Sequence, residues 1–430
     1  MYKLVIKGGT TLNGIVKIAG SKNAALPILF ASILADGPIN LINTPHLSDV
    51  STTLRLLMDM GAEFILESDN SLYIDSSKLT KLTGEYDLVK TMRASILALG
   101  PMLAKYKEAK ISLPGGCAIG TRPVNLHLKA LEDLGAKIHV KNGYIYATTD
   151  QLIGTDIHFE QVSVTATENI LMAATLAKGL TTIHNAAQEP EIVDLVDCLI
   201  KMGAKITGAG TSIITVQGVS SLSGASHSVC PDRIEAGTYL IAAAITGGKV
   251  TLKNVRYQSM QSVLDKLKET GADIDCNDNT ITLDMKGKRP KAVNIKTSVY
   301  PNFPTDMQAQ FCALNCIADG QSAITETIFE NRFMHIPELS RMGAELTLEG
   351  NTVICKGVKS LTGANLMATD LRASASLVLA GLAATGTTTI ERVYHLDRGY
   401  ETIEEKLKLL GAQIERIQDR EKYHVNHCTI

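Results

Sequence analysis

The chain has 430 residues, more than one hydrophobic core usually serves, so two domains are expected. Lysine and arginine number 42 against 44 for aspartate and glutamate, which excludes a global positive field for nucleic acid. No apolar run reaches the roughly 18 residues of a membrane span, and residues 1–14 read as a strand and a turn rather than a secretion signal. Eight irregularly spaced cysteines favour a reduced, cytoplasmic protein.

A short phrase ending in Gly-Ala recurs six times along the chain. Each copy closes an amphipathic stretch, as at Met260, Leu264 and Leu267, whose spacing is helical. We therefore predict six amphipathic helices that end in left-handed glycine caps. The intervals of 74, 68, 68, 72 and 68 residues exceed those of common solenoid repeats, which indicates a module of several elements. The marker glycines are Gly61, Gly135, Gly203, Gly271, Gly343 and Gly411.

A second kind of helix is predicted upstream of the amphipathic ones. Residues 236–246, 306–318 and 373–385 are apolar on nearly all sides, which is typical of fully buried helices. β-Branched strands follow such helices, for example at 250–252, and hairpin strands follow the Gly-Ala phrase, for example at 353–355. The module is thus strand, buried helix, strand, amphipathic helix and two hairpin strands, and three modules per domain would place helices inside and sheets outside.

Polar or charged residues stand at the start of all six buried helices. A helix N-terminus attracts anions, so these ends would form one anion site if the helices of each domain run parallel. Ordinary capping is an equally good explanation for Thr165. It explains Lys22, Arg93 and Arg372 poorly, because a cation opposes the helix dipole unless an anion is present. The six residues are Lys22, Arg93, Thr165, Arg233, Asp306 and Arg372, at 37 to 42 residues before their marker glycines.

The second module carries an insertion at residues 113–123, which reads Leu-Pro-Gly-Gly-Cys-Ala-Ile-Gly-Thr-Arg-Pro. Its glycines and prolines predict a loop. Cys117 on this loop is a candidate reactive thiol, because nearby cations such as Arg122 favour the thiolate. Cys312 and Cys316 lie four residues apart in an apolar helix, so core packing is the better interpretation for them.

Five motifs resemble the enolpyruvyl transferase family and, within it, the UDP-N-acetylglucosamine 1-carboxyvinyltransferases. The likeness extends from residue 1 to about residue 416. It implies an α/β fold of two inside-out barrel domains, each of three βαβαββ repeats, with an active site in the cleft between them. The implied domains are 22–229, with the Cys117 loop, and 1–21 plus 230–430, with Asp306, Arg332 and Arg398. The motifs are residues 19–24 (AGSKNA), 113–123, 304–308 (PTDMQ), 329–333 (FENRF) and 395–401 (HLDRGYE).

The resemblance implies transfer of the enolpyruvyl group of phosphoenolpyruvate to the 3′-hydroxyl of UDP-N-acetylglucosamine, with release of phosphate, as the first committed step of peptidoglycan precursor synthesis. Cys117 is similar to the family's proton donor, which also forms a covalent phosphoenolpyruvate adduct, so fosfomycin is expected to alkylate it. Asp306 is similar to the base, with Lys22 and Arg398 as further catalytic residues. No metal or organic cofactor is implied, and the oligomeric state stays open.

By the same resemblance, phosphoenolpyruvate is bound by Lys22, Asn23, Arg122, Arg332, Asp370 and Arg398. UDP-N-acetylglucosamine is bound by Arg93, Arg122, Pro123, Val124, Asn125, Leu126, Gln161, Val162, Ser163, Val164, Asp306 and Ile328. Two of these positions depart from the family pattern. Asn125 replaces an aspartate near the uracil, and Gln161 replaces a lysine found in some members, so nucleotide-sugar affinity is the property they put in question.

Two other functions are weighed against this one. 5-Enolpyruvylshikimate-3-phosphate synthase has the same fold and a cation-rich site, but it lacks the loop that carries Cys117 and Arg122. A non-catalytic paralogue that senses UDP-N-acetylglucosamine would bind the nucleotide sugar without releasing phosphate, and the intact catalytic positions argue against it.

Overall fold

The computed structural model describes residues 2–90, 92–113 and 124–418. These residues form six four-stranded sheets, and all six have the spatial strand order 1-2-4-3. Strands 1 and 2 of each sheet are parallel, and the other neighbouring pairs are antiparallel, as in the sheet that contains β15. The sheets stay open, so each domain is a ring of three modules rather than a continuous barrel. The predicted module is therefore confirmed.

Three of the sheets belong to the first half of the chain. In spatial order they are β14 (Ser226–Ser228), β3 (Ile39–Ile42), β5 (Leu72–Asp75) and β4 (Glu63–Leu66); β6 (Thr83–Gly84), β7 (Glu108–Ser112), β9 (Tyr144–Thr148) and β8 (Lys137–Lys141); and β10 (Asp156–His158), β11 (Leu180–His184), β13 (Ile213–Gln217) and β12 (Lys205–Thr207).

The other three sheets combine the N-terminus with the second half of the chain. They are β2 (Asn13–Lys17), β15 (Lys249–Lys253), β17 (Thr280–Asp284) and β16 (Asp273–Asn277); β18 (Ile295–Lys296), β19 (Gln321–Thr325), β21 (Thr352–Lys356) and β20 (Glu345–Glu349); and β22 (Asn365–Met367), β23 (Thr387–Glu391), β1 (Tyr2–Lys7) and β24 (Gln413–Gln418).

The buried helices lie inside, where they pack on one another and on the sheets. Their small and apolar side chains allow burial on nearly every side. They are α1 (Lys22–Ala31), α4 (Leu99–Tyr106, after the 3₁₀ turn η2, Arg93–Ala98), α6 (Val164–Ala174), α8 (Arg233–Ile245), α10 (Gln308–Ile317, after η4, Thr305–Met307) and α12 (Leu371–Ala383). Asp306 thus lies in a 3₁₀ turn before its helix and not in the helix itself, which corrects the predicted start at 306.

The amphipathic helices follow as predicted. All six marker glycines have φ between 90° and 110°, a conformation that only glycine adopts without strain, so the predicted caps are confirmed. These helices are α2 (Ser48–Asp59), α5 (Asn125–Asp133), α7 (Pro190–Lys201), α9 (Gln261–Glu269), α11 (Ile336–Arg341) and α13 (Ile403–Leu409). The remaining turns are η1 (Ser32–Leu34), α3 (Tyr86–Val89), η3 (Tyr257–Met260) and η5 (Val393–Arg398).

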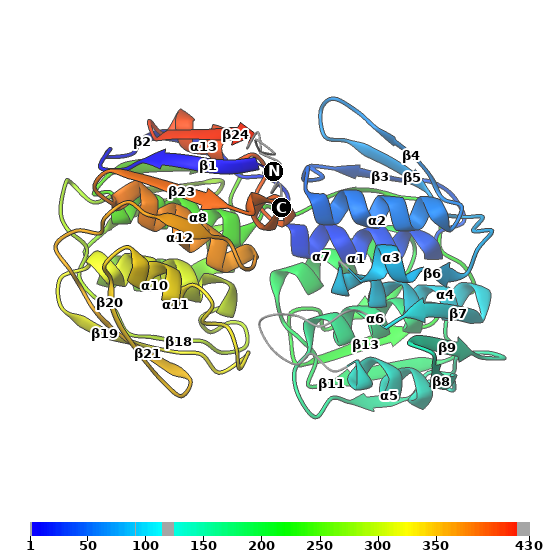
Figure 1. Cartoon of the computed structure of the whole chain (residues 1–430). Helices are drawn as coiled ribbons and strands as arrows, with labels where there is room; N and C mark the ends of the chain where they lie inside the picture. The colour runs from blue at the N-terminus through cyan, green and yellow to red at the C-terminus, as the bar shows by residue number, and fades with distance from the viewer. Residues whose placement is uncertain (1, 91, 114–123, 419–430) are drawn as a thin grey trace, which may run out of the picture.

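Two hydrophobic cores divide the chain. One is built from buried residues between Ala24 and Cys230, and the other from Leu4–Ile18 together with Ile234–Ile414. Figure 1 shows the corresponding lobes side by side, and we call them the first and the second domain. The boundaries 22–229 and 1–21 plus 230–430 are our proposal, which the division of the cores supports.

The two segments that connect the domains run next to each other. The Ser21 amide donates to the Cys230 carbonyl at 2.7 Å, and Gly20 forms a bridge with Pro231. A Cβ on Gly20 would lie 2.0 Å from the Asn43 carbonyl oxygen, so only glycine fits here. The paired segments place the start of α1 at the junction of the domains.

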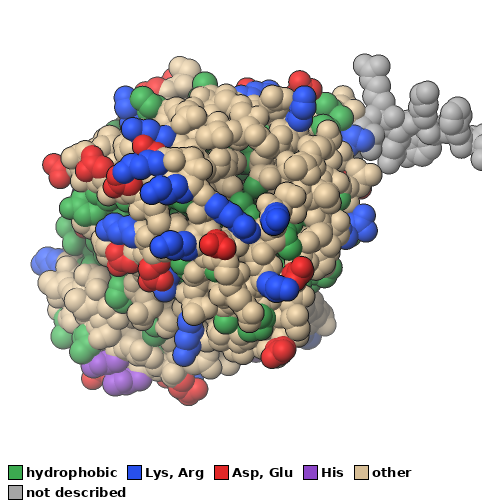
Figure 2. Space-filling view, turned by 90° about the vertical axis from the view of Figure 1, so that its left-hand side faces the viewer, with side chains coloured by type: hydrophobic (Ala, Val, Ile, Leu, Met, Phe, Trp, Pro, Cys, Tyr) green, Lys and Arg blue, Asp and Glu red, His purple; other side chains and the backbone are tan. Residues whose placement is uncertain are grey.

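The outer faces of the sheets are ordinary solvent-exposed surfaces. Lys286 pairs with Asp273 at 2.8 Å and Lys356 with Glu345 at 3.1 Å, both between neighbouring strands or their ends. Figure 2 views the outer face of the second domain and shows basic and acidic side chains interspersed. None of the described helices is long and apolar enough to cross a membrane. These surfaces bear no part of the candidate site described next.

Candidate active site at the junction of the domains

Asp306 lies between two arginines of the second domain. Its Oδ1 accepts a hydrogen bond from Arg332 Nη2 at 2.7 Å, and its Oδ2 accepts one from Arg372 Nη2 at 3.1 Å. Burial by itself would raise the pKa of Asp306, but Arg372 and Arg332 outweigh it and hold the pKa well below its ordinary value. Asp306 is therefore ionised at neutral pH and is bound by both guanidinium groups.

Arg372 is buried, with 3% of its side chain exposed, and its guanidinium lies over the Tyr400 ring at 5.4 Å. Its Nε and Nη1 have no hydrogen-bond acceptor among the described residues. Buried donors without acceptors cost free energy, so an anionic ligand that accepts these bonds would be favoured. The sequence indicates Arg372 as a cation at a helix start, where an anion would be needed, and its Nε and Nη1 donors are suited to bind such an anion.

Asp370 caps the same helix. Its Oδ1 accepts from the backbone amides of Arg372 at 2.9 Å and Ala373 at 3.0 Å, which fixes the start of α12. The neighbouring His335 is buried, and this burial lowers its pKa to about 4, so the imidazole is neutral at pH 7. The observed contacts of Asp370 are thus those of a helix cap that holds Arg372 in place.

Lys22, at the start of α1, is linked through Asp49 to Arg398 of the second domain. Lys22 Nζ lies 3.0 Å from Asp49 Oδ2, and Arg398 of the second domain donates to the same carboxylate from Nε at 2.9 Å and Nη2 at 3.3 Å. Burial raises the pKa of Asp49, but Lys22 and Arg398 together shift it below its ordinary value. Asp49 thus joins two of the predicted catalytic residues.

A second ion pair connects the domains through Glu191 of α7. Arg233, at the start of α8, donates to Glu191 from Nε at 3.0 Å and from Nη2 at 3.3 Å. The Arg233 guanidinium also lies over the Tyr300 ring at 5.5 Å. Glu191 is 3% exposed, so this is a largely desolvated, bidentate contact.

His127 of the first domain lies close to two of the residues predicted at helix starts, Arg93 and Thr165. Arg93 begins η2, and Thr165 Oγ1 contacts His127 Nε2 at 3.3 Å. Burial, followed by the charge of Arg93, lowers the pKa of His127 to about 3, so the ring is neutral. Ser163 caps α6 by accepting from the Ala166 amide, so the capping explanation for Thr165 is wrong.

The structure brings some predicted residues together and leaves others apart. Lys22, Asp306, Arg332, Arg372 and Arg398 are linked by the contacts above and by mutual electrostatic effects on the pKa of Lys22 and Asp306. Arg93 belongs instead to the separate group around His127, whose pKa its charge lowers, and Ser163 caps α6. Within the described part of the chain, no hydrogen bond or ion pair to the Asp306 group is formed by Asn23, Val124, Asn125, Leu126, Gln161, Val162, Val164 or Ile328. Cys117, Arg122 and Pro123 lie outside the described residues.

Sequence reasoning missed Asp49 and Glu191, although the repeat held the signal. Each acid is the second residue of its amphipathic helix and stands 12 positions before its marker glycine, since 61 − 49 and 203 − 191 both equal 12. When the modules are aligned on these helices, both acids fall at the same position of the repeat.

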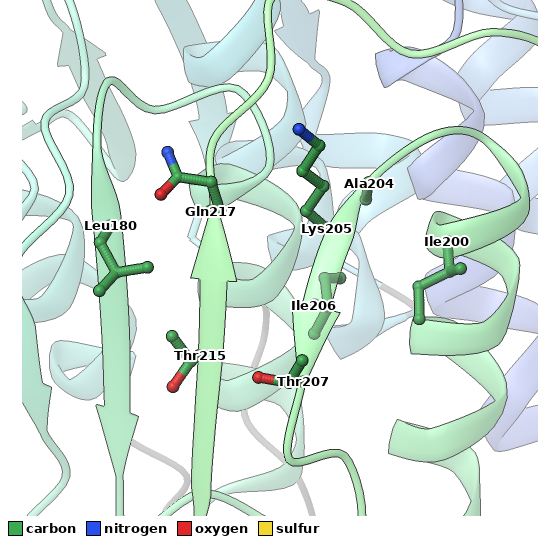
Figure 3. A pocket seen from close by; sticks show the side chains of 8 residues that line it. All are labelled: Leu180, Ile200, Ala204, Lys205, Ile206, Thr207, Thr215 and Gln217. Carbon is green, nitrogen blue, oxygen red and sulfur yellow. The ribbon is translucent and has the colours of Figure 1, made fainter.

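A surface pocket of the first domain lies away from this chemistry. It is formed by strands β11, β12 and β13 and the end of α7 (Figure 3). Among the described lining residues only Lys205 is titratable, and none of them is a predicted site residue. The lining residues are Leu180, Ile200, Ala204, Lys205, Ile206, Thr207, Thr215 and Gln217. The cluster around Asp306 and Asp49 is therefore the better candidate for an active site.

Comparison with known proteins shows the family to which the chain belongs. The profile of the EPSP synthase (3-phosphoshikimate 1-carboxyvinyltransferase) family matches residues 6–407. The UDP-N-acetylglucosamine 1-carboxyvinyltransferase of Ruthia magnifica is 83% identical over 419 residues, which cover 97% of this chain and 100% of the relative. The enzyme of the same name from Histophilus somni is 57% identical, over 98% of this chain and 99% of the relative. The chain belongs to the enolpyruvyl transferase family.

Solved structures agree with the fold of this family. The enolpyruvyl transferase NikO from Streptomyces tendae superposes with a TM-score of 0.88 at 24% identity, over 96% of this chain and 98% of NikO. An EPSP synthase from Acinetobacter baumannii gives a TM-score of 0.76 at 20% identity, over 97% and 100% of the two chains. At these identities the likeness concerns the fold alone. The expected two-domain, inside-out α/β architecture of an enolpyruvyl transferase is confirmed.

Proposed function

We propose that this chain is a UDP-N-acetylglucosamine 1-carboxyvinyltransferase. It would transfer the enolpyruvyl group of phosphoenolpyruvate to the 3′-hydroxyl of UDP-N-acetylglucosamine and release phosphate, in peptidoglycan precursor synthesis and in the cytoplasm. The relatives of that name, which match the whole chain, support the substrate pair. The observation that carries the chemistry is a set of four cations around two carboxylates at the domain junction: the buried Arg332 and Arg372, the largely buried Lys22, and the partly exposed Arg398.

The cations suit a ligand that bears a phosphate and a carboxylate. Guanidinium groups bind such oxyanions through paired, charge-assisted hydrogen bonds, and Arg372 has two buried donors available for them. Lys22 has three donor hydrogens, of which the described contacts use one. Phosphoenolpyruvate bound here would lie next to Asp306. We propose Lys22, Asn23, Arg122, Arg332, Asp370 and Arg398 as its binding residues.

The reaction needs a proton donor and a base. Protonation of the methylene carbon makes the neighbouring carbon of phosphoenolpyruvate electrophilic, and the sugar hydroxyl oxygen then bonds to it. The hydroxyl proton leaves to a base, and loss of phosphate together with a methyl proton restores the double bond. We propose Asp306 as the base and Cys117, from the sequence resemblance, as the acid.

The two arginines that bind Asp306 determine how strong a base its carboxylate is. A carboxylate whose pKa is held well below its ordinary value accepts protons poorly. An anionic substrate that draws on Arg332 and Arg372 would weaken both contacts, and the pKa of Asp306 would rise as a result. The base would then gain strength when phosphoenolpyruvate is bound.

Phosphate release tests the proposed function. The enzyme is expected to release phosphate from phosphoenolpyruvate with UDP-N-acetylglucosamine and not with shikimate 3-phosphate, and Cys117→Ala is expected to abolish release. Release with shikimate 3-phosphate alone would make the chain an EPSP synthase. Binding of the nucleotide sugar without release would make it a sensor.

Fosfomycin provides an independent test of the Cys117 proposal. An electrophilic epoxide should alkylate a thiolate in a cation-rich loop, so intact-mass spectrometry should show one adduct, mapped to the peptide that contains Cys117. The Cys117→Ala variant is the control, and an unmodified wild-type peptide would contradict the proposed thiolate.

A further inference from the structure

A buried carboxylate, Glu326, is connected to Arg332 through the hydroxyl of Thr305. Glu326 follows β19 and is 2% exposed. Its Oε1 accepts hydrogen bonds from Thr297 Oγ1 at 2.8 Å and from the amides of Ile328 at 2.8 Å and Phe329 at 3.3 Å. Its Oε2 accepts one from Thr305 Oγ1 at 2.8 Å. These four bonds satisfy the buried acid and fix its position.

Thr305 connects this acid to Arg332. A threonine hydroxyl has one hydrogen, and Thr305 gives it to Glu326 Oε2, because its other partner, the Arg332 guanidinium, can only donate. The Thr305 oxygen is thus left to accept from Arg332 Nη1, which lies at 2.8 Å. The directions of both bonds are therefore fixed, from Arg332 to Thr305 and from Thr305 to Glu326.

The guanidinium of Arg332 is held at three places. Nη1 donates to Thr305, Nη2 donates to Asp306 at 2.7 Å, and the Phe329 ring centroid lies 5.3 Å from its central carbon. The group is planar, so fixing both terminal nitrogens sets the direction of every remaining donor. Thr305 is one residue before Asp306, so the contact also orients the turn that carries the proposed base.

We propose that Thr305 and Glu326 are positioning residues for enolpyruvyl transfer, a proposal that rests on the proposed function above. Glu326 holds the Thr305 hydroxyl, and Thr305 holds Arg332 in the orientation in which it contacts Asp306 and meets phosphoenolpyruvate. The same carboxylate fixes the amide of Ile328, a proposed nucleotide-sugar residue. One buried acid thus positions a residue proposed to bind phosphoenolpyruvate, Arg332, and a residue proposed to bind the nucleotide sugar, Ile328.

Three variants at matched positions test this proposal. Thr305→Val has nearly the shape of threonine but no hydroxyl, Thr305→Ser keeps the hydroxyl, and Thr297→Val removes a different bond to Glu326 that does not involve Arg332. We expect Thr305→Val to raise the KM for phosphoenolpyruvate about tenfold and to lower kcat, as loss of one charge-assisted hydrogen bond of ~1.4 kcal/mol would. Thr305→Ser should restore both values, and Thr297→Val should lower the thermal midpoint without this selective effect.

The pH dependence of kcat gives a readout that a purely structural role would not change. With Arg332 no longer held, the pKa of Asp306 should rise, so the acidic limb of kcat should lie at higher pH in Thr305→Val than in Thr305→Ser. Identical profiles and identical KM values in these two variants would overturn the proposal, as would the same selective loss in Thr297→Val. Wild-type enzyme in the same assay separates the two questions, because a wild type that releases no phosphate refutes the proposed function itself.

Discussion

Asp49 and Glu191 occupy the same position in two copies of one module, and each binds an arginine of the other domain. Their partners make them different. Asp49 binds Lys22 and Arg398, which we propose to contact phosphoenolpyruvate, whereas Glu191 binds Arg233, which belongs to neither proposed substrate set. Repetition supplied two equivalent contacts between the domains, and only one of them joins residues of the proposed substrate site.

The largest effect is expected for Asp49→Asn. Lys22 and Arg398 would repel each other without the carboxylate between them, and both would lose the orientation that it gives them. Removing one member of a buried charged pair costs about 2–5 kcal/mol, so kcat/KM for phosphoenolpyruvate should fall roughly 100-fold. Steady-state phosphate release measures this. An unchanged kcat/KM would show that Asp49 merely fills the site before substrate arrives.

Glu191→Gln should act on both substrates alike. The amide keeps one acceptor for Arg233 but loses the charge, so the contact between the domains should weaken by about 1 kcal/mol, and both KM values should rise by a similar factor of roughly five. Small-angle scattering with UDP-N-acetylglucosamine should show a larger radius of gyration than for wild type. If only the KM for phosphoenolpyruvate rose, Glu191 would have the same role as Asp49, which would contradict the comparison.

Acid should weaken the Asp49 contact in a defined direction. The pKa of Asp49 is lower in the folded protein than its ordinary value of 3.8, so the unfolded chain binds a proton first as the pH falls. The stability that Asp49 contributes is therefore complete above about pH 5 and is lost as the pH falls through the folded pKa. Urea midpoints at pH 6 and at pH 3 should show the difference between wild type and Asp49→Asn shrinking at the lower pH.

The smallest expected effect is a difference between the two variants in how salt changes their thermal midpoints. The Arg398 side chain is 36% exposed and that of Arg233 is 10% exposed, so ions should screen the Asp49 contact more than the Glu191 contact. Raising NaCl from 0.05 to 0.5 M should lower the thermal midpoint of Glu191→Gln more than that of Asp49→Asn, because only the former retains the exposed pair. Equal slopes would contradict this ranking.

Much of the fold follows from the sequence because the repeat is explicit. The glycine after each amphipathic helix, the apolar helix before it and the β-branched strand between them are local signals, and the structure confirms them. For the candidate site, the sequence predicts only those residues that lie in a recognisable motif or at the start of a buried helix. Asp306 was found in this way, but its ion pair with Arg372 joins residues 66 positions apart. No local pattern contains such a contact.

Other parts of the site depend on shape rather than on residue type. Thr305 stood inside a recognised motif, yet its hydroxyl could have capped a helix, and only the positions of Glu326 and Arg332 show what it does. Glu326 itself looks like a solvated acid at the end of a strand until the loop beyond it folds back over its carboxylate. The offset of 12 residues that Asp49 and Glu191 share could have been read from the sequence.

The N-terminal strand β1 lies between β23 and β24, the last two strands of the chain. On the ribosome, residues 22–229 can complete their three sheets as soon as they emerge, whereas β1 must wait for its partners. At a synthesis rate of about 5–20 residues per second, the wait from β1 to its partners at residues 387–418 lasts roughly 20–80 s. During this time the oldest strand of the protein is an unpaired edge, and the nascent chain depends on the later half to protect it.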